Sequence, residues 1–267
     1  MIKAEQRLYR FSANLGFLWT HLPLDEAIIR AADAGFDAVE CHWPYDMPAS
    51  QIADALEATG LSMLGINARC GDRAAGEFGL AALPGRQAEA RADIDEAIAY
   101  AAAINAAAVH VMAGKSDASP AAQQCYRDNL AYAASQAMPH GLTILIEPIN
   151  RMDVPGYHLS YVEDGVELIT ALGFENIKLM FDCYHTQIMQ GDICRRLTAN
   201  LHHIGHVQMA AVPDRGEPDA GELFYPAVLA ALYAAGYQGF VGAEYRPRDT
   251  IDTGLGWLAK FKQADGR

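Results

Sequence analysis

Short β-rich runs alternate with longer alanine-rich helical stretches from one end of the chain to the other, and this alternation constrains the fold more than any other feature. It is the pattern of repeated βα units around a parallel sheet. Several runs are nearly continuous apolar stretches, as strands buried on both faces should be. We predict eight strands, at Leu8–Leu15, Ala38–Trp43, Ser62–Ala68, Ala107–Ala113, Thr143–Asn150, Ile177–Tyr184, Ile204–Ala210 and Phe240–Arg246.

The segments between these strands have the apolar spacing of helices, as in Leu24–Ala34 and Arg91–Ala103. The chain has 267 residues, close to the ~250 that are typical of an α/β barrel. We therefore predict the α/β class and a single (β/α)₈ TIM barrel. Glycines also stand where the helices should end before the next strand, namely at Gly35, Gly60, Gly173 and Gly236.

The chain is predicted to form one domain over residues 1–267, because no Ser/Gly/Pro-rich linker or low-complexity segment divides it. An open doubly wound sheet is the alternative α/β architecture. Its usual phosphate fingerprint, GxGxxG after the first strand, is absent from the sequence.

One βα connection is unusually long, running from Arg69 to Arg86 with the sequence RCGDRAAGEFGLAALPGR. Loops longer than ~12 to 15 residues are usually functional or disordered. Since this loop follows a strand, it would lie over the mouth of the barrel, where such folds keep their active sites. A lid and a plain insertion both fit the sequence.

The composition argues against several classes of partner. A formal net charge of −13, from 20 Lys+Arg and 33 Asp+Glu, does not suit a nucleic-acid ligand. The five cysteines show neither CxxC spacing nor pairing with histidines at zinc-site intervals, so we predict reduced, buried thiols. No stretch approaches the ~20 apolar residues of a membrane span, and the start lacks the apolar run of a secretion signal. A soluble cytoplasmic protein is expected.

Four of the later strands share a feature, since each apolar run ends in a side chain that can bind a metal. Burying any one of these side chains without a partner would be costly. Strands of a parallel barrel all run in one direction, so side chains at their carboxyl ends can converge although they lie far apart in the sequence. The four are Glu147 in TILIEP, Asp182 in KLMFDCYH, Gln208 in GHVQMA and Glu244 in VGAEYRP.

Three carboxylates gathered at one point repel one another unless a cation neutralises them. Each residue singly could be a strand-end polar group capped by a backbone amide or paired with an arginine, but four on successive strands favour a shared ligand. If Gln208 binds through its carbonyl, all the donors are oxygen, which suits Mg²⁺ or Mn²⁺ better than zinc. We predict one divalent metal ion, Mg²⁺ or Mn²⁺, as the cofactor.

Six segments together resemble a known family. They are FSANL at Phe11–Leu15, AAGEFGLAALPGR at Ala74–Arg86, LIEPINRMDVPGYHL at Leu145–Leu159, FDCYHTQIMQGD at Phe181–Asp192, GHVQMA at Gly205–Ala210 and RGEPDAGELFY at Arg215–Tyr225. The chain resembles the hydroxypyruvate isomerase family, within the xylose isomerase-like barrel superfamily that also holds ketose 3-epimerases and a DNA-repair endonuclease. The similarity covers nearly the whole chain.

The resemblance implies that Glu147, Asp182, Gln208 and Glu244 hold the metal, and that Glu147 and Glu244 also form the acid/base pair. Hydroxypyruvate and tartronate semialdehyde differ in which of two adjacent carbons carries the carbonyl. Interconverting them removes a proton beside the carbonyl and returns one to the neighbouring carbon. A metal at the carbonyl and hydroxyl oxygens would stabilise the enediolate formed in between.

The resemblance also suggests residues that bind the substrate. Family members place a histidine at the position of His185 to contact substrate oxygens, and a hydrogen-bonded loop histidine is the alternative. Arg215 is predicted to neutralise a substrate carboxylate through a bidentate contact. An ion pair between Arg215 and either Glu217 or Glu222 is the competing interpretation.

Asn67 ends the third strand and Lys115 follows the fourth, so both are predicted to reach a substrate at the mouth of the barrel. The chain departs from the family here. Members carry a run similar to Asn-Leu-Pro-Pro-Gly-Asp-Trp, whereas residues 67–73 read NARCGDR. The added Arg69 and Arg73 favour a longer or more anionic substrate, such as the four-carbon 2-oxo acid of the family's oxo-tetronate isomerase branch.

Other functions stay open at the level of sequence. Ketose 3-epimerases use the same two-glutamate logic, but they generally have His where this chain has Gln208. DNA cleavage fits poorly, because that relative assembles several metals with many more histidines. A barrel that binds sugar acids without catalysis is the non-enzyme alternative, although Glu147 and Glu244 are both retained. The resemblance further implies a homo-oligomer.

Overall fold

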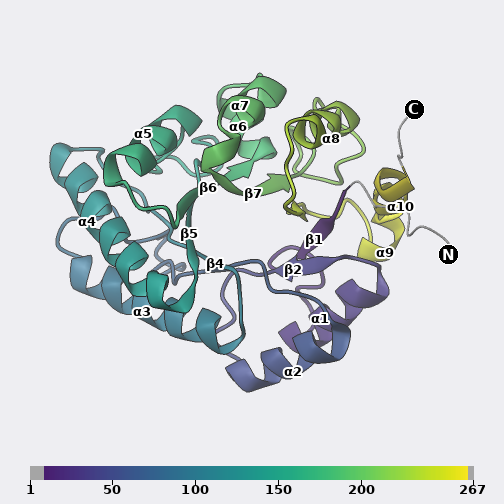
Figure 1. Cartoon of the computed structure of the whole chain (residues 1–267), viewed down its shortest axis with the longest axis horizontal. Helices are drawn as coiled ribbons and strands as arrows, with labels where there is room; N and C mark the ends of the chain where they lie inside the picture. The colour runs from purple at the N-terminus through teal and green to yellow at the C-terminus, as the bar shows by residue number, and fades with distance from the viewer. Residues whose placement is uncertain (1–8, 264–267) are drawn as a thin grey trace.

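The computed structural model describes residues 9–263, whose strands form one eight-stranded sheet surrounded by helices (Figure 1). All eight predicted strands are confirmed, and with them the (β/α)₈ barrel. The paired segments are shorter than the predicted runs, which continue into the loops. Leu8, the first residue of the first predicted strand, lies outside the described residues. The strands are β1 (Phe11–Asn14), β2 (Ala38–Glu40), β3 (Ile66–Asn67), β4 (Ala108–His110), β5 (Thr143–Ile146), β6 (Ile177–Asp182), β7 (Ile204–Met209) and β8 (Val241–Ala243).

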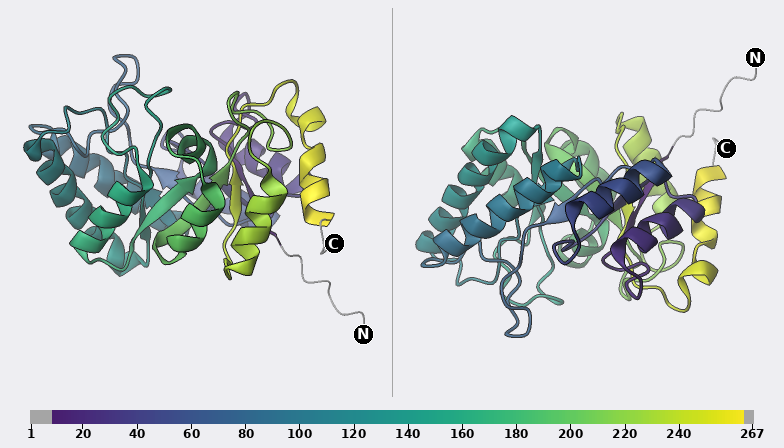
Figure 2. Two further views of the ribbon diagram at one scale, coloured as in Figure 1. Left: turned by 90° about the horizontal axis from the view of Figure 1, so that it is seen from above. Right: turned by 90° about the horizontal axis from the view of Figure 1, so that it is seen from below.

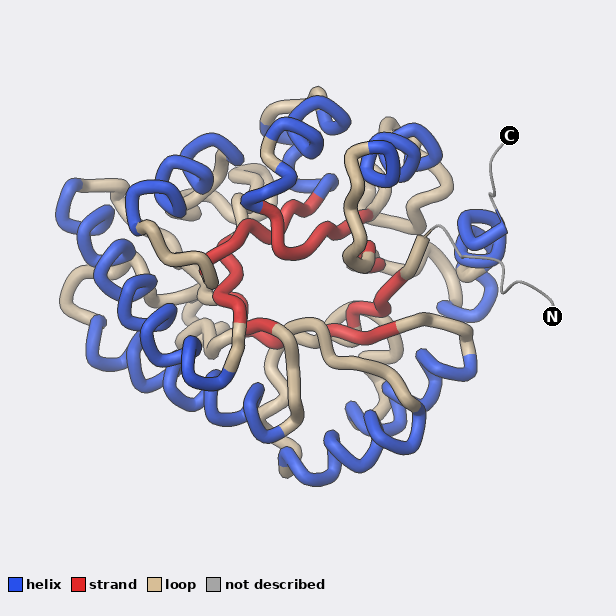
Figure 3. The backbone as a smooth tube through the Cα atoms, viewed as in Figure 1, coloured by secondary structure: helices blue, strands red, loops and turns tan. Residues whose placement is uncertain are grey.

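Neighbouring strands pair in parallel in the order β2-β1-β8-β7-β6-β5-β4-β3. The ring closes between β2 and the segment before β3. The Val39 N–H donates to the Ser62 carbonyl at 3.0 Å, and the Leu64 N–H donates back to the Val39 carbonyl at 2.8 Å. The strands therefore surround one central space, which Figure 3 shows end-on.

Helices alternate with the strands and lie outside the ring (Figure 3). The predicted helices Leu24–Ala34 and Arg91–Ala103 are confirmed, and all four predicted helix-ending glycines have φ between 70° and 87°, a conformation that side chains disfavour. The helices are α1 (Leu24–Asp33), α2 (Ala49–Thr59), α3 (Gln87–Ala103), α4 (Pro120–Ala137), α5 (Val162–Leu172), α6 (Cys183–Met189), α7 (Ile193–Ala199), α8 (Tyr225–Ala234), α9 (Ile251–Gly254) and α10 (Gly256–Gln263), with 3₁₀ turns at Met138–His140 and Leu201–His203.

The barrel has a large apolar core and a separate, partly polar interior. Helices cover the outside of the strands, and Trp257 of α10 packs edge-on against Phe11 of β1 with ring centroids 5.5 Å apart. Branched apolar side chains usually fill the inside of such a barrel. Here a small cluster of Ala108, Leu145 and Met180 lies apart from the main core. Polar side chains from most of the strands surround an enclosed cavity next to it.

The long connection Arg69–Arg86 contains no helix and projects beside the β5–α5 loop from one end of the barrel (Figure 2). It contacts several neighbouring loops at that end. Phe78 packs edge-on against Tyr157 at 6.0 Å, and the Arg73 guanidinium stacks on Trp43 at 4.4 Å. This connection therefore lies across the loops that follow β2 and β5.

All five cysteines are free thiols and four of them are buried, as predicted. Burial raises the pKa of the Cys183 thiol well above its usual value, so this group stays protonated and unreactive. Among residues 9–263, no helix is both long enough and apolar enough to cross a bilayer.

Candidate active site

The carboxyl ends of β5, β6, β7 and β8 bring the four predicted metal ligands to one end of the barrel. Glu147 directly follows β5 and Glu244 directly follows β8, while Asp182 ends β6. Gln208 of β7 lies opposite Asp182 in the strand register. All four residues are buried, with at most 6% of their surface exposed. The strand geometry thus supplies a compact group of oxygen donors.

Two overlapping clusters connect three of these side chains, Glu147, Asp182 and Glu244. In the first, ligand atoms of Glu147, Asp182 and His185 all lie within 4.8 Å of one another. In the second, Arg215 joins two carboxylates, since its Nη2 lies 2.8 Å from Glu244 Oε2 and 3.4 Å from Asp182 Oδ2. The structure therefore brings together five predicted site residues, with Asp182 common to both clusters.

The buried carboxylates have very different proton affinities. Burial, reinforced by the charges of Glu244 and Asp182, raises the pKa of Glu147 well above its usual value. Burial also raises the pKa of Asp182 to about 7, although Arg215 opposes the shift. At Glu244 burial acts in the same direction, but Arg215 and His42 outweigh it and lower the pKa to about 2. The pKa values of neighbouring carboxylates diverge in this way when only some of the carboxylates have cationic partners.

Arg215 is held under strain between two aromatic rings. Its backbone is left-handed, with φ of 56°, which is uncommon for a residue with a side chain. Its guanidinium lies 4.8 Å from the ring centroids of both Phe17 and Tyr184. The competing ion pair with Glu217 is not what forms, because Glu217 binds Arg248 at 3.1 Å. The predicted carboxylate-binding arginine is thus directed into the site.

The hydrogen bonds around His185 fix which of its ring nitrogens carries the proton. The Asn150 backbone N–H donates to His185 Nδ1 at 3.3 Å, and the Asn150 side chain contacts the same nitrogen at 2.6 Å. The side-chain oxygen of Asn150 accepts from the Asp153 N–H at 2.8 Å, so its NH₂ group must face His185. Burial lowers the pKa of His185 well below its usual value. The ring is therefore neutral, and Nε2–H is a donor directed at Glu147 and Asp182 rather than a metal ligand.

Two contacts of Glu244 were missed by sequence reasoning. Asn14 donates from Nδ2 to Glu244 Oε1 at 3.0 Å, and its own oxygen is occupied by the Gly16 N–H. His42 Nε2 lies 3.1 Å from the same Glu244 oxygen. A side chain at Gly16 would lie 2.3 Å from the His42 ring, so the glycine makes room for it. Asn14 is part of FSANL and ends β1, so a search for polar residues at the ends of early as well as late strands would have included it, whereas His42 lies in the loop after β2.

The remaining predicted site residues differ in position. Asn67 lines the enclosed cavity together with Glu147, Gln208 and Glu244. Lys115 does not line this cavity, and its ammonium donates to the Gly76 carbonyl at 2.7 Å. Lys115 therefore holds the long connection in place, and the structure gives no support to its predicted contact with the substrate.

The two arginines of the long connection also differ. The Arg69 Nη2 lies 3.0 Å from Glu96 Oε1 on α3, so Arg69 is engaged on the outside of the barrel rather than over its mouth. The exposed Arg73 stacks on Trp43, which follows His42 in the loop after β2. Of the two, only Arg73 lies where it could favour an anionic substrate.

The donor set fits a hard divalent cation. Glu147 Oε1 and Gln208 Oε1 are both buried without a hydrogen-bond partner among residues 9–263. Such buried, unpartnered oxygens are costly and call for a ligand. All four predicted ligands offer oxygen, which is the donor that Mg²⁺ and Mn²⁺ prefer.

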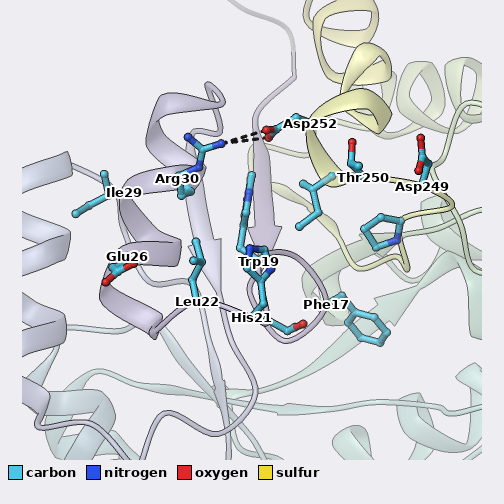
Figure 4. A pocket seen from close by; sticks show the side chains of 13 residues that line it. Phe17, Trp19, His21, Leu22, Glu26, Ile29, Arg30, Asp249, Thr250 and Asp252 are labelled. Atoms are coloured by element: carbon cyan, nitrogen blue, oxygen red, sulfur yellow. Dashed lines mark hydrogen bonds and ion pairs between the residues drawn. The ribbon is translucent and has the colours of Figure 1, made fainter.

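A larger groove lies away from these residues (Figure 4). It occupies about 880 Å³ beside α1 and α9 and is lined by Trp19, Ile29 and the ion pair of Arg30 with Asp252. The cavity beside the carboxylates encloses only about 20 Å³. We place the candidate active site at the small cavity, because it holds the buried titratable groups and unpartnered oxygens that chemistry requires.

Fold and site together define an α/β barrel with a buried acidic cluster at the carboxyl ends of its later strands. A family model described as xylose isomerase-like TIM barrel matches residues 28–261, and the chain belongs to this family.

Individual relatives narrow the class. The chain is 46% identical over 256 residues to the 2-oxo-tetronate isomerase of Cupriavidus necator. The aligned region covers 94% of this chain and 98% of the relative. The chain is 36% identical over 258 residues to the hydroxypyruvate isomerase of Escherichia coli, with 96% and 100% covered. A crystal structure described as AP endonuclease, family 2, from Brucella melitensis superposes with a TM-score of 0.91 at 40% identity, covering 94% of this chain and 98% of that one. The resemblance to the hydroxypyruvate isomerase family is confirmed, and the chain is an isomerase.

Proposed function

We propose that this isomerase acts on small oxo acids and moves a carbonyl between adjacent carbons, with one Mg²⁺ or Mn²⁺ ion held by Glu147, Asp182, Gln208 and Glu244. The observation that carries the proposal is the convergence of these buried oxygen donors at the carboxyl ends of four strands. When bound, the ion would supply positive charge that stabilises an enediolate.

Glu147 and Glu244 are proposed to transfer the proton between the two carbons. Glu244 accepts hydrogen bonds from Asn14 and Arg215, which favour its ionised form. Glu147 Oε1 has no such partner in the described part of the chain, so it is free to exchange a proton with the substrate. One carboxylate would take the proton beside the carbonyl, and the other would return a proton to the neighbouring carbon.

Two neighbours of the pair are proposed to orient the substrate. His185 presents Nε2–H within 3.7 Å of Glu147, where it can donate to a substrate oxygen. Arg215 offers a planar fork of donors that suits a carboxylate. Both residues lie at the carboxylate cluster, so the acid group and the reacting carbons of a short substrate can be held together.

Two observations favour a four-carbon oxo acid over hydroxypyruvate. The relative with 46% identity is a 2-oxo-tetronate isomerase, whereas the hydroxypyruvate isomerase compared here is 36% identical. In addition, Arg73 and Trp43 line a cavity together with His42, which contacts Glu244, so they could contact the end of a longer anionic substrate. Hydroxypyruvate, with three carbons, would not need such a contact.

Turnover of 2-oxo-tetronate and hydroxypyruvate by metal-loaded protein tests this choice. We expect kcat/KM to be about 10-fold or more higher for the four-carbon acid, the scale on which one extra carbon changes discrimination. A neutral ketose serves as the control, because its epimerisation at a comparable rate would support a ketose 3-epimerase instead. Failure to convert either acid would contradict the proposal.

The pH dependence of stability gives an independent prediction for the metal-free protein. Glu147 and Asp182 have raised pKa values in the folded protein, that of Asp182 about 7. Their contribution to stability is therefore fully present only when the pH is below the pKa values of the unfolded chain. It is lost as the pH rises through about 7. The thermal unfolding midpoint should therefore decrease as the pH is raised from about 5 to about 8. The expected decrease is roughly 2 to 4 °C for each kcal/mol of stability that is lost. Added Mn²⁺ should raise it more at pH 8, because the ligands must be deprotonated. Calorimetry that shows no fall without metal would contradict the assignment.

A further inference from the structure

Gln208 also belongs to a second polar layer inside the barrel, and the proposed chemistry does not use the other members of this layer. It consists of Glu40 from β2 together with His206 and Gln208 from β7. Glu40 is 4% exposed and His206 is 6% exposed. Burying a carboxylate costs free energy unless other groups interact with it. The contacts of Glu40 identify these groups.

Glu40 contacts both other members of the layer through one oxygen. The Gln208 Nε2 donates to Glu40 Oε2 at 3.2 Å, and His206 Nε2 lies 2.8 Å from the same atom. Gly242 of β8 leaves the space in which these groups meet. A side chain there would lie 2.1 Å from Glu40 Oε1 and 2.8 Å from His206 Nε2. Three strands are thus shaped around the contact between Glu40 and Gln208.

This contact decides how the amide of Gln208 is turned. The amide presents its NH₂ group to Glu40, because Gln208 Nε2 is the atom that donates to Glu40 Oε2. The amide oxygen then faces the opposite way, and Gln208 Oε1 is buried without a partner among the described residues. Rotating the amide by half a turn would place oxygen against oxygen. The oxygen and NH₂ ends of a side-chain amide are nearly equal in shape, so packing alone does not select one orientation of Gln208.

We propose that Glu40 is a positioning residue that holds the Gln208 amide with its carbonyl oxygen directed to the metal. The inference rests on the proposed metal site. Partners of this kind orient a ligand without touching the ion, and their loss typically weakens metal binding by about 10- to 100-fold. His206 gives the Glu40 carboxylate a second polar neighbour, since its Nε2 lies 2.8 Å from Glu40 Oε2.

Changing residue 208 from Gln to Glu distinguishes a positioning role of Glu40 from a general contribution of Glu40 to folding. A glutamine can bind the ion only in one of its two orientations, whereas both oxygens of a glutamate can bind it. Replacing Glu40 by Gln lets residue 40 either donate or accept, so the Gln208 amide loses its fixed orientation. In a Gln208→Glu background there is no orientation to lose, and the same replacement removes a repulsion between two carboxylates.

Mn²⁺ binding to four full-length proteins tests the proposal: the parent, Glu40→Gln, Gln208→Glu and the double variant. Free Mn²⁺ is measured by electron paramagnetic resonance, and circular dichroism records the unfolding midpoint. We expect Glu40→Gln to raise the Kd for Mn²⁺ about 10- to 100-fold in the parent. In the Gln208→Glu background it should leave the Kd unchanged or lower it.

The outcomes separate this inference from the proposed function. A parent protein that binds no Mn²⁺ would overturn the metal site and the inference with it. A parent that binds Mn²⁺ as tightly as Glu40→Gln would overturn only the inference. An equal loss of affinity in both backgrounds would show a merely structural role for Glu40. If Glu40→Gln does not fold, Glu40→Asp keeps the charge but withdraws the carboxylate from both Gln208 and His206, and an unchanged Kd there would also overturn the inference.

Discussion

Stripping the protein of divalent metal with EDTA should abolish its isomerase activity, and adding Mg²⁺ or Mn²⁺ should restore it. The expected loss is on the order of 10³-fold or more, because removing even one group that stabilises a developing oxyanion costs about 10² to 10³. Without a cation, Glu147, Asp182 and Glu244 also stay close together as buried acids, and burial raises the pKa of the first two, that of Asp182 to about 7. The measurement is turnover of 2-oxo-tetronate before and after metal is returned.

Two controls make this result specific. Circular dichroism of the stripped protein should show a folded barrel, because an unfolded sample would lose activity for a trivial reason. EDTA that has itself been saturated with Mg²⁺ should have no effect. Full turnover by protein shown by elemental analysis to be free of metal would contradict the proposed chemistry and leave only proton transfer by the side chains.

The barrel could be predicted because each of its units carries its own signal. A strand buried on both faces appears in the sequence as an apolar run, and the end of a helix is often marked by a glycine such as Gly60 or Gly173. Glu147 and Asp182 could be found for the same reason, since an acid at the end of an apolar run stands out from its neighbours. Periodicity and strand direction together then indicate that such acids meet at one end of the barrel.

The contacts that refine the site could not be predicted, because they depend on which loops and early strands face one another. Nothing in the sequence around His42 shows that it will reach Glu244, more than 200 positions away. Nor does the sequence of Arg215 reveal its left-handed backbone, which directs the side chain into the site. The contact of Lys115 with the Gly76 carbonyl could not be predicted either, because a cation after a strand can bind its own loops as easily as a substrate, and its contact with the substrate stays a prediction. The homo-oligomer stays a prediction.

Replacing Glu147 or Glu244 by Gln should lower kcat by about 10² to 10⁴, the range that general acid–base groups contribute. Glutamine keeps an oxygen for the metal but cannot carry the proton, so Mn²⁺ binding should survive in both variants. Turnover is therefore measured at saturating Mn²⁺. Glu96→Gln is the control, because Glu96 is a glutamate on the outside of the barrel that pairs with Arg69, and its loss should leave kcat unchanged.

The order in which the two glutamates act can be read from deuterium incorporation in D₂O. A variant that has lost the first base cannot break the C–H bond, so the unreacted substrate should gain no deuterium. A variant that has lost the second group still forms the enediolate and should return deuterium to the original carbon without completing the reaction. Glu147 Oε1 has no hydrogen-bond partner in residues 9–263, whereas Glu244 is held by Asn14, His42 and Arg215. These donors favour the ionised form of Glu244, which a base requires, so we expect Glu244→Gln to be the variant that blocks exchange, and NMR showing rapid exchange in it would reverse the assignment.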